Sequence, residues 1–112
     1  GKIMEAAEKF FHTVGIETYN CMNQREAIES LTEVKAVIVS ENSSLVSDEE
    51  FIATLQEQTT IPILLVKNGA TLKITRFKPG ESPSSIHCSN MLKKTDAETW
   101  KVIWQEIQKL IT

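Results

Sequence analysis

Two unbroken apolar runs constrain the fold of this chain most strongly. Residues 36–39 read Ala-Val-Ile-Val, and residues 61–66 read Ile-Pro-Ile-Leu-Leu-Val. A short continuous apolar run is typical of a strand that is covered on both faces, as in a parallel sheet. Between the runs, Ser47 is predicted to cap a helix, with Glu50 at the reciprocal position of a capping box. Strand, helix and strand in this order indicate two parallel strands joined by a right-handed crossover.

The segment before these runs continues the alternation of helices and strands. Residues 3–14 place apolar side chains at helical spacing, and Gly15 is predicted to end this helix. Residues 16–21 alternate in the manner of a short edge strand. Asn23, with Glu26 three residues later, is predicted to begin a second helix.

The carboxyl-terminal part predicts a hairpin and a final helix. The Asn-Gly pair at 68–69 is a strong turn signal, and residues 72–77 alternate as a strand that returns after it. A short strand is predicted at 86–89. Thr95 begins another capping box, ahead of an apolar stripe along residues 100–111. The whole order indicates one α/β domain, residues 1–112, with helices on both faces of its sheet.

Composition excludes several classes of protein. The net charge is −3, with lysines and arginines interleaved among acids, so no basic face for nucleic acid is predicted. No apolar run has the length that spans a bilayer, and no signal peptide precedes the first helix. We therefore expect a cytoplasmic protein that binds neither nucleic acid nor membrane.

Metal binding is not predicted from the histidines and cysteines. His12, His87, Cys21 and Cys88 lack the close pairs of a zinc site, and His87 and Cys88 are predicted to point to opposite faces of a strand. Cys21 and Cys88 would allow one disulfide, but free thiols are the expectation for a chain that can build a core without it.

The order and spacing of these segments resemble the receiver domain of response regulators and hybrid histidine kinases over nearly the whole chain. Residues 15–18 and 26–31 look like the receiver's second strand and second helix. Residues 36–39 and 61–66 look like its third and fourth strands, and residues 92–100 like its fifth strand and the start of its last helix. The resemblance implies a flavodoxin-like, three-layer fold with a parallel sheet.

The residues that carry receiver chemistry are largely replaced. The position of the phosphoaccepting aspartate falls on Ser40, with Glu41 beside it, and the position of the phosphate-binding hydroxyl falls on Val66. Lys93 fills the position of the receiver lysine, and Lys94 replaces the proline that follows it. A serine without an adjacent base is a poor nucleophile, and valine cannot bind phosphate. The resemblance thus implies a domain without catalysis, metal or cofactor.

By this resemblance the chain is a non-phosphorylatable pseudo-receiver that acts as a protein-interaction module in two-component phosphorelay signalling, as part of a larger sensor histidine kinase. The implied partners are a kinase core, a histidine-phosphotransfer protein or another receiver, and a homodimer is also compatible. The surface near the last helix is the implied docking face.

The receiver's first strand, which lies in the middle of its sheet, has no counterpart, because the first helix begins at the start of the sequence. An empty slot would leave backbone groups unsatisfied, at about 1–3 kcal/mol each. Three segments could fill this slot: a strand from upstream in the native protein, a strand from a second copy, or residues 72–77. Alternatively, the strand order differs from that of a receiver.

The second hypothesis is a small flavodoxin-like ligand-binding protein or enzyme. Its pocket would lie at the carboxyl ends of the strands. The polar residues expected there are Ser40, Glu41, Asn42, Lys67 and Asn68, and they contain no evident acid–base pair.

Overall fold

The computed structural model describes residues 2–21, 23–40, 47–68, 71–88 and 93–111. Its elements, in chain order, are α1 (Lys2–Thr13), α2 (Gln24–Ser30), a single 3₁₀ turn η1 (Leu31–Glu33), β1 (Val37–Ser40), α3 (Asp48–Gln58), β2 (Ile63–Asn68), β3 (Leu72–Phe77), β4 (Ser84–His87) and α4 (Ala97–Ile111). The predicted polar loop at 41–46, the turn residue Gly69 and the end of the predicted strand at 86–89 lie outside the described residues.

Within the described residues, the sheet has four strands in the order β1-β2-β3-β4, and it is mixed. β1 and β2 are parallel, with Val37 opposite Ile63, as the two apolar runs predicted. β3 returns antiparallel to β2, and β4 is antiparallel to β3. The prediction of a fully parallel sheet is therefore wrong, because a connection as short as the one between β2 and β3 can join only antiparallel strands.

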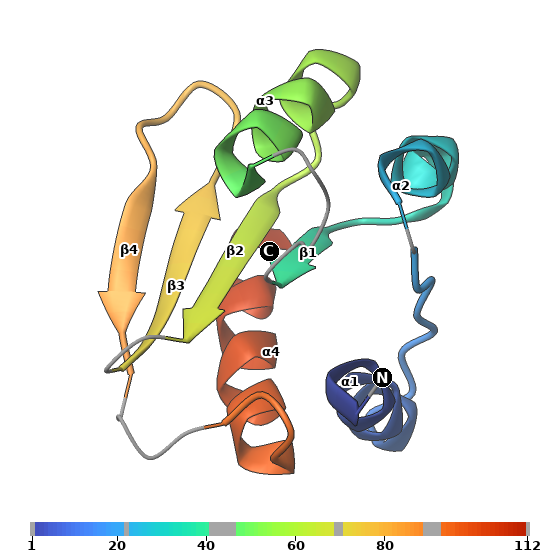
Figure 1. Cartoon of the computed structure of the whole chain (residues 1–112), viewed down its shortest axis with the longest axis vertical. Coiled ribbons are helices and arrows are strands. Elements are labelled where there is room, and N and C mark those ends of the chain that lie inside the picture. Colours follow the sequence, from blue (N-terminus) through green and yellow to red (C-terminus); the bar gives the residue numbers. More distant parts are fainter. Residues whose placement is uncertain (1, 22, 41–46, 69–70, 89–92, 112) are drawn as a thin grey trace.

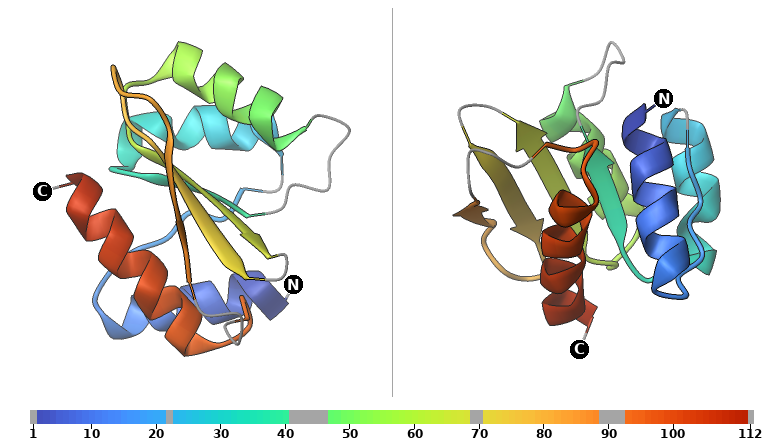
Figure 2. Two further views of the ribbon diagram at one scale, coloured as in Figure 1. Left: turned by 90° about the vertical axis from the view of Figure 1, so that its left-hand side faces the viewer. Right: turned by 90° about the horizontal axis from the view of Figure 1, so that it is seen from below.

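Helices cover both faces of this sheet, which gives three layers (Figures 1 and 2). Figure 2 shows α1 and α4 on one side of the strands and α2 and α3 on the other. The α1/α4 side encloses a cluster that includes Leu64 and Val66, and the α2/α3 side one that includes Ile63 and Leu65. Alternate residues of β2 thus contribute to both cores, which accounts for its continuous apolar sequence.

The local signals for the first three helices are confirmed. The Asn23 Oδ1 atom accepts a hydrogen bond from the Glu26 amide at 2.9 Å, and the Ser47 Oγ atom accepts one from the Glu50 amide at 3.2 Å. Gly15 ends α1 with a φ of 77°, a left-handed conformation that favours glycine.

Three predicted boundaries are wrong. Residues 16–21 are not in a strand, since in the described chain no strand lies next to them. β4 begins and ends two residues earlier than the predicted strand at 86–89. Thr95 does not cap α4: the Asp96 amide donates to the carbonyl of Lys93 at 3.0 Å, so Thr95 lies in a turn and Asp96 directly precedes the helix.

The position of β1 also differs from the expectation. The resemblance to a receiver places this strand inside the sheet, yet β1 is an edge strand in the described part of the chain. Its two faces still pack against the two clusters, as predicted, with Val39 buried and the other residues half-buried. Residues 72–77 do not lie beside β1 either, because β3 pairs on the far side of β2. The hypothesis that they fill the empty slot is therefore wrong.

Candidate functional site

Ser40 and Val66, the two positions compared with receiver chemistry, are paired on the neighbouring strands β1 and β2. Ser40 ends β1 and lies opposite Val66 of β2 in the parallel ladder. Val66 is fully buried in the cluster beneath α1 and α4. The Ser40 Oγ atom is buried and has no hydrogen-bond partner in the part of the chain that the structure describes. The two positions thus meet without a carboxylate, and Glu41 lies outside the described residues.

The turn before α4 presents two adjacent lysines in different environments. Lys93 is exposed, and its carbonyl accepts a hydrogen bond from the Thr99 hydroxyl. Lys94 is only 1% exposed, and its carbonyl accepts a hydrogen bond from the indole Nε1 of Trp100. The resemblance assigned the receiver-type lysine to Lys93, which is exposed, and the burial of Lys94 was not predicted. No sequence signal distinguishes two neighbouring lysines in a turn.

The residues predicted for a ligand pocket at the strand ends do not form one acid–base group. The Lys67 ammonium lies 3.1 Å from a carboxylate oxygen of Glu49 and 3.9 Å from one of Asp48, both in the first turn of α3. A backbone hydrogen bond of Glu49 and, next, the interaction with Lys67 hold the pKa of the Glu49 carboxyl below its ordinary value. Asn68 ends β2, and residues 41–42 lie outside the described residues.

A groove of about 590 Å³ lies along the outer edge of β1. β1 contributes all four of its residues to the lining. One wall comes from α1 and α4 and the other from α2 and α3, and the extended segment 15–21 also lines the groove. The helical walls carry apolar side chains, among them Ile3, Phe11, Ala27, Phe51 and Trp104. Figure 1 shows the extended segment 16–21 passing beside this region between α1 and α2. The groove lies where the sequence analysis expected an empty slot, because the receiver's first strand has no counterpart in this chain.

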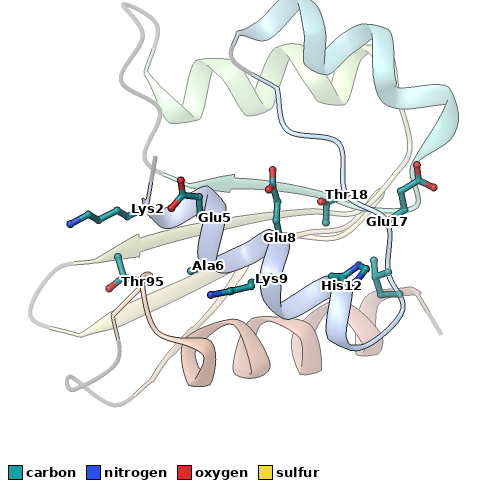
Figure 3. Close-up of a pocket in the computed structure, with 10 residues that line it drawn as sticks. Lys2, Glu5, Ala6, Glu8, Lys9, His12, Glu17, Thr18 and Thr95 are labelled. Atoms are coloured by element: carbon teal, nitrogen blue, oxygen red, sulfur yellow. The ribbon is translucent and has the colours of Figure 1, made fainter.

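A second hollow follows the outer side of α1 (Figure 3). It is open to solvent and carries charges of both signs, with Glu5 and Glu8 between Lys2 and Lys9 along the helix. All four of these side chains are exposed. Interleaved charges of this kind are the normal solvated face of an amphipathic helix.

The histidines and cysteines do not gather into a site. No group of three metal-binding side chains exists among the described residues. The Nδ1 atom of His87 is 3.2 Å from the Thr71 hydroxyl on the exposed side, while Cys88 packs against the cluster beneath α4. Burial, followed by the charge of Glu106, raises the pKa of the Cys88 thiol. Cys21 and Cys88 are both free.

None of the described helices combines the length and apolar character needed to cross a membrane. Comparison of the chain with protein-family models, curated proteins and solved structures gives no match.

Proposed function

We propose that this chain is a non-phosphorylatable receiver-like domain that works by binding a protein partner in a phosphorelay, within a larger cytoplasmic sensor kinase. The observation that carries the proposal is the register of two parallel strands, in which Ser40 at the end of β1 lies opposite Val66 of β2. The resemblance assigned the phosphoacceptor and the phosphate-binding hydroxyl to these positions from sequence alone. Their adjacency in space is what a receiver-like arrangement requires.

The same positions argue against phosphate transfer. An aspartyl phosphate forms when a carboxylate attacks phosphorus, and Ser40 offers a buried hydroxyl with no base beside it among the described residues. Val66 is fully buried and has no polar atom in its side chain to contact a phosphoryl oxygen. The domain therefore acts through its surface and not through phosphorylation.

The fold is proposed to be a variant of the flavodoxin-like type. The succession α2, β1, α3, β2, with helices on both faces, supports this assignment. The variant part is the β2–β3–β4 meander, which takes the place of a parallel fifth strand. α4 still returns across the face that α1 covers.

The docking face is proposed to be the solvent side of α4. Lys101, Gln105 and Lys109 are exposed there, one helical turn apart in succession. A histidine-phosphotransfer protein is the partner that this function requires. Because no phosphoryl group controls the domain, we expect the complex to form equally with and without magnesium and a phosphodonor.

The test combines mass and affinity. The purified domain is incubated with acetyl phosphate and Mg²⁺, beside an active receiver as positive control, and its intact mass is measured. Binding to a histidine-phosphotransfer domain of the same organism is measured by calorimetry. Lys101→Glu on α4 should weaken binding severalfold. Lys73→Glu, which makes the same charge change at an exposed site on β3, should leave it unchanged.

Two results would overturn the proposal. Stoichiometric phosphate on the domain would refute the loss of receiver chemistry. Absence of binding, or equal weakening by both charge reversals, would refute docking through α4.

A further inference from the structure

The outer edge of β1 has backbone groups directed into the groove. On the inner edge, the Val37 amide donates to the Pro62 carbonyl at 3.1 Å. Alternate residues of a parallel strand bond to opposite sides, so the amides of Ile38 and Ser40 point away from β2. β1 ends the order of strands in the described part of the chain. An unpaired strand edge is a template for another extended chain.

The groove covers this edge from both sides. Ile3 and Phe11 line it on the α1 side, and Ala27 and Phe51 line it on the α2/α3 side. A strand placed between these walls would have both its faces buried. Its sequence must therefore be apolar at successive positions, as in β2, and not alternate. The four residues of β1 set the paired length at roughly 13 Å, at about 3.3 Å per residue.

One end of the groove carries charged side chains. Glu33 and Lys35 lie just before β1, and Glu17 lies beside His12 at the carboxyl end of α1 (Figure 3). Glu17, Glu33 and Lys35 all line the groove together with Tyr19, and the charge of Glu17 and, next, that of Glu33 raise the pKa of the Tyr19 hydroxyl. With two carboxylates and one ammonium, this end of the groove favours a positively charged group on the bound segment. A strand that binds parallel to β1 has its amino end at this charged end of the groove.

The described strands of this chain do not supply the occupant. β3 pairs on the far side of β2. The free edge of the sheet at β4 exposes Ser84, Ser85 and His87, which are too polar for a slot with two apolar walls. The β4 edge of a second copy is therefore unsuitable.

We propose that the groove binds an extended segment of a partner protein as an added strand, parallel to β1. The segment has about four consecutive apolar residues preceded by lysine or arginine. Backbone hydrogen bonds to β1 provide affinity, and the two walls select its apolar side chains. This inference rests on the sheet edge and does not depend on the proposed receiver-like function.

The probe is the peptide Lys-Lys-Val-Ile-Val-Ile-Gly-Ser, labelled with fluorescein at its carboxyl end, and binding is followed by anisotropy. Ser40→Pro removes an outward amide while keeping the inner ladder, and should weaken binding roughly two- to tenfold. Ser40→Ala, the matched control, changes the same side chain but keeps that amide, so it should weaken binding less than Ser40→Pro does. Circular dichroism melts of both variants establish that they fold.

Charge reversal provides a test that leaves β1 intact. Glu17 and Glu33 are exposed, so Glu17→Lys combined with Glu33→Lys is expected to fold normally. This double variant should bind the lysine peptide more weakly, by about twofold to fivefold for each charge pair. A peptide that begins Glu-Glu should bind the double variant with the lost affinity restored.

Saturable binding with both dependences supports the proposal. It is overturned by no binding, or by equal affinity for Ser40→Pro and Ser40→Ala together with no response to charge reversal. It is also overturned if the protein dimerises through this edge in sedimentation, because the occupant is then a second copy. Binding only when the peptide is joined ahead of Lys2 would likewise overturn a partner in trans.

Discussion

Glu106 is the residue whose replacement tests the packing of α4 most directly. Its side chain is 7% exposed, and its carboxylate lies 3.4 Å from Nη1 of Arg76 on β3 and 3.0 Å from the Lys109 ammonium. Glu106→Gln keeps the shape and removes the charge. The Arg76 guanidinium, with a side chain 28% exposed, then loses its carboxylate.

The size of the effect follows from these exposures. Breaking a fully buried ion pair costs about 3–5 kcal/mol, and a hydrogen bond to a charged group contributes about 1.5–3 kcal/mol. Because Arg76 keeps contact with water, we expect a loss of about 1–2 kcal/mol. Lys109 is 65% exposed, so Lys109→Gln should cost less than about 1 kcal/mol.

Urea unfolding followed by circular dichroism measures both variants. With a slope of about 2 kcal/mol/M, Glu106→Gln should lower the midpoint by roughly 0.5–1 M. Glu106 is also the second cause, after burial, of the raised pKa of Cys88. The variant should therefore lower that pKa, and iodoacetamide should label Cys88 faster at pH 8, as peptide mapping would show. Equal midpoints for Glu106→Gln and Lys109→Gln, with unchanged labelling, would refute this account.

Three further substitutions test local features of the fold. Trp100→Phe leaves the Lys94 carbonyl without its indole donor and should cost about 1–3 kcal/mol in a thermal melt; an unchanged melting temperature would contradict it. Gly15→Ala forces a side chain into a left-handed conformation and should cost about 1 kcal/mol, with Gly15→Asn costing less. Lys67→Met should raise the pKa of Glu49 toward its ordinary value in an NMR titration. In the parent protein, the lowered pKa of Glu49 stabilises the fold at pH values above the ordinary pKa of a glutamate, and this stabilisation is lost as the pH falls through the lowered pKa. Lys67→Met removes part of this stabilisation, so the variant should lose less stability than the parent over the same fall in pH.

Sequence reasoning succeeded where the determining contacts are local. The caps at Asn23 and Ser47 are hydrogen bonds across three residues, and the hairpin after β2 follows from the turn residues between two strands. The two apolar runs identified β1 and β2 because burial between helix layers leaves a continuous apolar sequence.

The failures share a non-local cause. Residues 16–21 have the alternation of a strand, but a strand exists only with a neighbour, and the described chain provides none there. The burial of Lys94 was not predicted at all, since it depends on how the turn meets Trp100. The groove beside β1 was anticipated only as a missing strand, and its acidic end was not anticipated at all.

The order of strands has a consequence for how this chain folds. β2, β3, β4 and α4 follow one another along the sequence, so their pairing closes only short loops. β1 must instead reach β2 across the whole of α3, and α1 meets α4 from the opposite end of the chain. Loop-closure entropy rises with separation, so we expect the carboxyl-terminal meander to form first and α1 to dock last. The groove, which needs α1 as a wall, would then be the last feature of the molecule to take shape and the first to open.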